Sequence, residues 1–355
     1  MGKQITSLDT LSSIAESTVV ALQRTDDFKT GKVPLSVLRS FLSGDSSGLL
    51  NGGLQLDGDF NNWNRGITSR SASSAGYLTD VGYASPDANM TIERRTSSTD
   101  QKLYSLRFFN TAVATVAAGD YNEHFRGKYP VGIPLSIIIR ATSSNSANEL
   151  KCNVYSEATP GTYTAGQTIA TDDYYDYRFD VGSISSSSAY GYFGIRADYV
   201  AASSTITIDS FRVVPTALLP TTGLPDGIFK PENPAMSALL CSQYYYVLGH
   251  SDTSYNAYLA PGYHVASQKS MFSINTPLRM VKDPTPGYQN IKVYNYGGYS
   301  ASYGITGIDS AIRGVNGTTA IKVIVSHAAS LGNGVSCNLG ADLKTTARLI
   351  FDATT

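Results

Sequence analysis

The chain has 355 residues, of which 42% are hydrophobic and 15% are charged. This length exceeds the size at which one hydrophobic core keeps growing, so we expect two or three domains. The formal net charge of -1 excludes the strongly basic surface that attracts DNA, RNA or an anionic membrane. No apolar run approaches the roughly 18 residues of a membrane span, and the N-terminus lacks a signal-peptide pattern, so we expect no membrane insertion.

The first 48 residues predict a helix, a hairpin and a second helix. Leu8, Leu11 and Ile14 recur at helical spacing, residues 18–23 are rich in β-branched side chains, and a second helix is expected from Pro34. A segment this small cannot bury a core alone, so we expect it to dock onto another structure or to trimerise.

Residues 49–214 predict an antiparallel β-domain. Short β-rich runs follow one another without intervening helices, which is typical of a sandwich or jelly roll. The predicted strands are residues 91–94, 103–109, 135–139, 151–155, 175–181, 190–195 and 205–214.

Residues 215–234 hold five of the fourteen prolines, which predicts a stiff, extended linker and a domain boundary. The remainder, residues 235–355, predicts a second β-domain, which we expect to be a β-sandwich at the tip of the molecule. The fold class is therefore mainly β, with two antiparallel β-sandwich or jelly-roll domains behind a short α-helical N-terminal segment.

Cysteine and histidine spacing gives no sign of a metal centre. Cys152, Cys241 and Cys337 are far apart and odd in number, which predicts buried thiols in a protein made in a reducing cytoplasm. The four histidines have no HxH or HxxxH spacing, and no nucleotide-binding or nucleophile motif is present. We expect no cofactor from these residues.

Three motifs in order resemble bacteriophage tail and fibre proteins. Residues 51–66 contain Asn-Gly-Gly-Leu and Trp63-Asn64-Arg65-Gly66, similar to the opening "NGGF-x-x-W-x-R-G" of a jelly roll related to carbohydrate-binding modules. Tyr77-Leu-Thr-Asp80 resembles the "Y-x-x-D" that follows it. Residues 239–247 resemble the "L-x-x-C-Q-R-Y-Y-Y" that starts a C-terminal β-domain, although Ser-Gln replaces Gln-Arg.

The resemblance implies a virion structural protein, assembled in the host cytoplasm. It implies a homotrimeric tail fibre or receptor-binding component that is attached to other virion proteins by residues 1–48 and binds host cell-surface polysaccharide without catalysis. Two alternatives stay open. One is a capsid or tail decoration protein with no glycan role, and the other is a host-polysaccharide hydrolase.

Sugar binding without catalysis needs aromatic ring faces with polar groups nearby. Trp63 lies at the start of the first jelly-roll strand, where a structural role is favoured over stacking on a sugar. We therefore expect the glycan contacts in tyrosine-rich C-terminal loops, at Tyr255, Tyr258, Tyr263, Tyr296, Tyr299 and Tyr303.

Carboxylates give two further hypotheses. Asp57, Asp59 and Asp209 lie near the first and last strands of the predicted jelly roll, where such modules often hold a structural calcium, although capping of strand ends is the favoured interpretation. A hydrolase would need two acids flanking the glycosidic bond. The available acids are Asp172, Asp173, Asp176, Asp180, Glu123 and Glu157.

Overall fold

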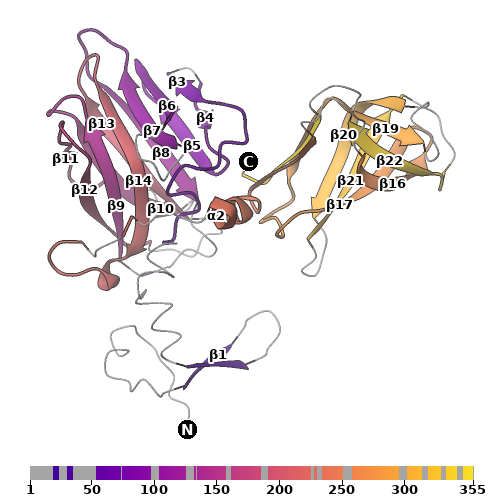
Figure 1. Ribbon diagram of the computed structural model, residues 1–355, viewed down its shortest axis with the longest axis horizontal. Coiled ribbons are helices and arrows are strands. Elements are labelled where there is room, and N and C mark those ends of the chain that lie inside the picture. Colours follow the sequence, from indigo (N-terminus) through magenta and orange to yellow (C-terminus); the bar gives the residue numbers. More distant parts are fainter. Residues whose placement is uncertain are drawn as a thin grey trace. The chain divides into compact units, whose positions relative to one another are not determined.

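The computed structural model describes residues 19–23, 30–34 and most of 53–354. Its internal gaps are residues 73, 97–103, 125–131, 133, 157–160, 185–190, 225–227, 230–233, 251–257, 296–301, 314–318, 329–332 and 342–346. The described chain consists mainly of antiparallel strands, with one α-helix, α2 (Pro234–Cys241), and one 3-10 helix, η2 (Thr216–Leu218) (Figure 1). The predicted mainly β fold class is confirmed.

Strands β1 (Val19–Gln23) and β2 (Thr30–Pro34) pair as an antiparallel hairpin, with Val19 opposite Pro34. The hairpin predicted within the first 48 residues is therefore confirmed. The two helices predicted on either side of it lie outside the described residues.

Two compact units divide the chain. The first comprises Met1–Asp59 and Pro86–Glu232, and the second comprises Phe60–Ser85 and Asn233–Thr355. The boundary after Glu232 falls at the end of the predicted linker. Residues 60–85 lie within the predicted jelly roll of residues 49–214, and in this division they are assigned to the second unit.

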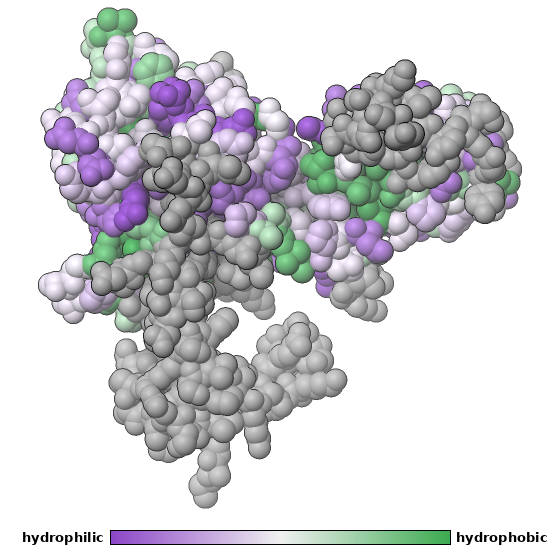
Figure 2. Space-filling model, in the orientation of Figure 1, coloured by the Kyte–Doolittle hydropathy of each residue, from purple (hydrophilic) through white to green (hydrophobic). Residues whose placement is uncertain are grey.

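The first unit is a β-sandwich. One sheet has the order β11-β10-β13-β8-β5-β4 and the other β12-β9-β14-β7-β6-β3, in which β3 (Ser69–Ser71), β4 (Gly76–Tyr77) and β5 (Gly82–Pro86) are short strands at the sheet ends. The sheets pack face to face, since Phe211 of β14 contacts Tyr121 of β8 and Phe193 of β13. The strands are β6 (Met90–Thr96), β7 (Tyr104–Asn110), β8 (Ala117–His124), β9 (Leu135–Ser143), β10 (Glu149–Ser156), β11 (Gln167–Thr168), β12 (Tyr175–Gly182), β13 (Gly191–Val200) and β14 (Thr205–Pro215). Over the visible face of this unit, hydrophilic residues surround small hydrophobic patches (Figure 2).

All seven strands predicted between residues 91 and 214 are present, whereas β8 and the short β11 were not predicted. Strand β8 reads Ala-Ala-Gly-Asp-Tyr-Asn-Glu-His, which has few strand-forming residues. Residues of β8 nevertheless alternate between buried and half-buried over most of the strand. Its pairing with neighbouring strands fixes which residues face the core.

The proline-rich segment is packed against the first unit. Leu219, Ile228 and Phe229 form a buried cluster with Ile138 and Val214. The described part of the predicted connector is therefore packed and not free in solvent, because its apolar side chains are more stable buried than exposed.

The second unit combines a short sheet with a closed barrel. The sheet has the order β15-β23-β18, and the barrel has the order β16-β17-β21-β20-β19-β22. The strands are β15 (Tyr245–His250), β16 (Tyr258–Ala266), β17 (Lys269–Asn275), β18 (Thr285–Gln289), β19 (Ile291–Asn295), β20 (Ser302–Arg313), β21 (Ala320–His327), β22 (Ser336–Ala341) and β23 (Ala347–Asp352). Within residues 60–86, β4 and β5 pair antiparallel, with Tyr77 opposite Tyr83.

A barrel takes the place of the β-sandwich expected in residues 235–355. Pairing irregularities interrupt β16 against both neighbours and β20 at two points against β21. Such irregularities increase strand twist, which allows a sheet to curl until its edges meet. The core of this unit includes Phe272, Val323, Leu339, Leu349 and Phe351. No helix in the described part of the chain is long and apolar enough to cross a membrane.

Glu123 is fully buried in the first unit, and its described hydrogen-bond donors are all uncharged. Its Oε1 accepts hydrogen bonds from the backbone N–H groups of Leu56 and Asp57, at 2.8 and 3.1 Å, and its Oε2 accepts one from the Tyr121 hydroxyl. Burial, and then the charge of Asp57, raises the pKa of Glu123 from 4.5 to about 8.

Because the folded state holds the Glu123 proton more tightly than the unfolded state, stability is greatest below pH 4.5 and is lost as pH rises towards 8. One such proton gives a slope of about 1.4 kcal/mol per pH unit. Glu123→Gln keeps an oxygen acceptor and should flatten this dependence, measured by urea unfolding followed by far-UV circular dichroism. An unchanged slope in the variant would contradict the assignment.

Candidate functional site

Arg65 joins residues 60–85 to the C-terminal strands of the second unit. Its Nη1 and Nη2 atoms donate to the two carboxylate oxygens of Asp352, at 2.6 and 3.2 Å. Nη2 also donates to Thr354 Oγ1 at 2.9 Å. The guanidinium lies 4.0 Å from the ring centroid of Tyr245 and 4.5 Å from that of Tyr77. Such a bidentate, stacked arrangement suits arginine and not lysine.

The side chains around Arg65 are arranged by the same segment. Arg65 Nε donates to the carbonyl of Thr79, and Asp80 accepts two hydrogen bonds from Asn64, from its backbone N–H and from its amide, both at 2.7 Å. Trp63 is 6% exposed and its indole N–H donates to the Phe60 carbonyl. Trp63 is thus largely buried, in line with a structural role.

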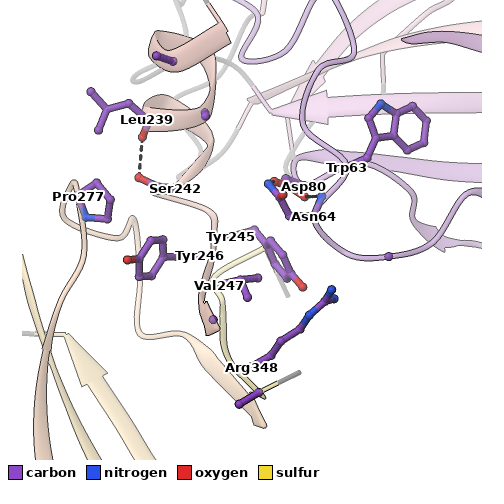
Figure 3. Close-up of a pocket in the computed structure, with 15 residues that line it drawn as sticks. Trp63, Asn64, Asp80, Leu239, Ser242, Tyr245, Tyr246, Val247, Pro277 and Arg348 are labelled. Atoms are coloured by element: carbon purple, nitrogen blue, oxygen red, sulfur yellow. Dashed lines mark hydrogen bonds between the residues drawn. The ribbon is translucent and has the colours of Figure 1, made fainter. Parts of the chain in front are cut away.

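A pocket of about 810 Å³ opens between this segment, helix α2, and strands β15 and β23 of the second unit. The register places Tyr245, Val247 and Gly249 of β15 opposite Asp352, Ile350 and Arg348 of β23. Tyr245 and Arg348 therefore project from the same face of this sheet (Figure 3). The lining residues are Trp63, Asn64, Gly66, Asp80, Ala235, Ala238, Leu239, Ser242, Tyr245, Tyr246, Val247, Gly249, Pro277, Ala347 and Arg348.

The pocket walls combine aromatic rings with convergent polar groups. Tyr246 stacks on Phe351 with ring planes 8° apart, which fixes its ring at the pocket wall. Burial raises the pKa values of Tyr245 and Tyr246, and burial also raises that of Asp80 against the opposing hydrogen bonds from Asn64. Both tyrosines are therefore neutral at physiological pH, and Asp80 holds its proton more tightly than an ordinary aspartate.

Tyr263 and Tyr303, the two predicted glycan-contact tyrosines with described side chains, are not among the described residues that line this pocket. Tyr263 of β16 is 44% exposed, and Tyr303 of β20 is half-buried with its ring 6.2 Å from that of His327. Within the described residues these two rings do not contact each other. Tyr258 lies in β16 with a side chain that is not described, and Tyr255, Tyr296 and Tyr299 lie outside the described residues. A glycan role for these six tyrosines stays a prediction.

The three aspartates considered for calcium are buried in the first unit. Arg212 Nη2 donates to both carboxylate oxygens of Asp59, at 3.0 and 3.2 Å, and both side chains are fully buried. The described residues contain no group of three or more His, Cys, Asp or Glu side chains placed to hold a metal ion. Calcium binding by Asp57, Asp59 and Asp209 stays a prediction that this arrangement does not favour.

The acids considered for hydrolysis do not form an acid and base pair in the described structure. Asp176 pairs with Arg140, and Asp180 pairs with Arg178. Burial raises the pKa of Asp180, but hydrogen bonds from Ser136 and Arg178 outweigh it and hold the pKa below its usual value. A glycosidase acid needs a raised pKa. Glu123 has one, but its side chain is fully buried.

Two distant histidines meet inside the barrel. Ser270 Oγ lies 2.7 Å from His264 Nδ1 and 2.9 Å from His327 Nε2, and Asn295 Oδ1 lies 3.3 Å from His264 Nε2. His264, Ser270 and His327 are at most 2% exposed. A substrate would not reach the hydroxyl, so we interpret this cluster as a polar part of the core.

Comparison with known proteins gives similarity of fold only. No protein-family model matches the sequence, and no curated protein matches it. A CBM61 module in complex with β-1,4-galactotriose has a TM-score of 0.31 at 10% identity, covering 46% of this chain and 98% of its own. A putative sugar-binding protein from Bacteroides thetaiotaomicron has a TM-score of 0.31 at 7% identity, covering 46% and 100%. The CBM22 tandem of Paenibacillus barcinonensis Xyn10C has a TM-score of 0.28 at 9% identity, covering 81% and 97%. The proposed function therefore rests on the side chains of this chain and not on these similarities.

Sequence reasoning missed Arg65 and Arg348 as functional residues. Arg65 is part of the quoted Trp63-Asn64-Arg65-Gly66 motif, so its position was marked, but its partners lie 287 and 289 residues away. Arg348 carries no local signal, because it is one charged residue in a strand of alternating burial.

Arg65→Lys should destabilise the second unit by about 1–3 kcal/mol, because lysine keeps the charge but loses the bidentate and stacked contacts. Trp63 is the only tryptophan, so its fluorescence during urea unfolding reports on this segment. Arg178→Lys, at a surface pair whose Asp180 side chain is 57% exposed, is the control and should change stability by less than about 0.5 kcal/mol. Equal unfolding midpoints for the two variants would refute the role of Arg65.

Proposed function

We propose that the chain is a non-catalytic carbohydrate-binding protein whose binding site is the pocket of the second unit. The observation that carries the proposal is the lining of that pocket, where Tyr245 and Arg348 project from one face of the sheet and Asn64, Asp80 and Tyr246 complete the walls. Ligand sites of this kind combine apolar or aromatic walls with a few placed polar groups. A volume of about 810 Å³ lies within the range of small-molecule sites.

We further propose that the protein is a bacteriophage virion component, a tail fibre or receptor-binding protein that attaches to host cell-surface polysaccharide. The support is the resemblance of residues 51–66, 77–80 and 239–247 to phage tail proteins. A homotrimer, attached to the virion by residues 1–48, would engage several weak sugar sites at once and so gain avidity.

A mass measurement tests the trimer. Multi-angle light scattering of the full chain is expected to give three times 37.9 kDa. A mass of 37.9 kDa across the concentration range would count against the trimer and the avidity argument, while leaving the pocket proposal in place.

A substitution that fills the pocket tests whether it is the carbohydrate-binding site. Ala238 is an exposed pocket-lining residue of α2, and Ala238→Leu adds bulk there without removing a hydrogen bond of the side chain. We expect the full chain to bind members of a glycan array of bacterial surface and matched synthetic saccharides, and Ala238→Leu to weaken that binding at least tenfold. Ala114→Leu, at an exposed site of the first unit, is the control and should bind as the parent does.

Absence of binding to every array member would overturn the carbohydrate proposal and favour the decoration protein with no glycan role. Binding that Ala238→Leu leaves unchanged would place the sugar elsewhere, with Tyr263 and Tyr303 as the next residues to test. Shortening of a bound polysaccharide during incubation would favour the hydrolase.

A further inference from the structure

The two arginines beside the pocket differ in what surrounds their charge. Arg65 is 9% exposed at its side chain and its guanidinium is bound to Asp352. Arg348 lines the pocket, is partly buried, and has no ion pair or hydrogen bond from its side chain to any other described residue. A partly buried guanidinium lacking an anion is more costly than a paired one, which makes Arg348 ready to accept an anionic partner.

The neighbouring strands of the sheet give Arg348 no acidic partner. Its neighbours across the sheet are Gly249 of β15 and Gln289 of β18, neither of which is an acid. Because Gly249 has no side chain, it gives the guanidinium of Arg348 no hydrogen-bond partner from this position. Asp352, the nearest acid along the same face of β23, is occupied by Arg65.

We propose that the pocket selects an acidic saccharide, one whose sugar ring bears a carboxylate, and that Arg348 binds that carboxylate. This inference rests on the proposed carbohydrate-binding function and names its ligand class. A guanidinium binds a carboxylate through two parallel N–H donors, which gives both affinity and orientation. The ring of Tyr245, which projects from the same face of the sheet as Arg348, then lies where the C–H surface of the same sugar can pack.

The charge in the pocket favours a carboxylate over a phosphate. Among the described residues that line the pocket, Arg348 is the only cationic one, so it can neutralise one negative charge and not two. Asp80 lies in the same wall, where burial raises its pKa above the usual value. A doubly charged phosphate would stay incompletely neutralised beside Asp80.

The test uses the full chain on an array of matched pairs, in which each uronic or sialic acid glycan is accompanied by its neutral counterpart and by a phosphorylated one. We expect at least tenfold tighter binding of carboxylate members than of their neutral partners, decreasing as salt is raised. Arg348→Gln should remove that preference, and Arg348→Lys should restore part of it. Lys322→Gln, an exposed charge removal on β21, is the control.

The outcomes separate the two proposals. Equal or tighter binding of neutral members, or a preference that survives Arg348→Gln, would overturn the acidic-sugar inference and leave carbohydrate binding in place. Stronger binding of phosphorylated members would overturn the carboxylate assignment. No binding to any member would overturn the proposed function itself. Since Arg348 has no partner among the described residues, Arg348→Gln should keep the parental thermal midpoint, which shows that the variant is folded.

Discussion

The ion pair between Arg65 and Asp352 is the contact on which the second unit depends. Its two residues are 287 positions apart, and the guanidinium is also stacked between the rings of Tyr77 and Tyr245. Burial opposes the charge of Asp352, but the hydrogen bonds from Arg65 outweigh it and hold the pKa of Asp352 below its usual value. Without this pair, both charged groups would be left partly desolvated.

The proposed binding pocket follows from that contact. Asn64, Gly66 and Asp80 form one wall because Arg65 fixes their segment against β23, and Tyr245 forms part of another because it stacks on Arg65. Strand β23 carries both Asp352 and Arg348. Asp352 forms an ion pair with Arg65, whereas the side chain of Arg348 forms no ion pair with another described residue. One arginine therefore organises the site, and the other is left for a ligand.

Local pattern predicted the first unit well and the second poorly. Residues 205–214 were predicted as a strand because alternation and β-branched side chains are local signals, and β14 spans Thr205–Pro215. Strand β8 was missed, since its register is imposed by its neighbours in the sheet. The membership of residues 60–85 and the closure of the barrel depend on pairings between distant residues, which spacing along the chain does not encode. The motif around Trp63 drew attention to Arg65. Arg348 was recognised as a candidate only from the structure, in which its side chain has no ion pair or hydrogen bond to another described residue.

The discontinuity of the second unit has a consequence for biosynthesis. Residues 60–85 leave the ribosome long before Asp352 and Thr354 are made, and at ordinary translation rates the interval is roughly 15–60 s. During that time Arg65, Tyr77 and Trp63 have none of their C-terminal partners, while the strands of the first unit are already emerging around them. The second unit is thus completed only after translation of its last strand, so a ribosome that stalls before β23 releases a chain with this segment unprotected against proteases.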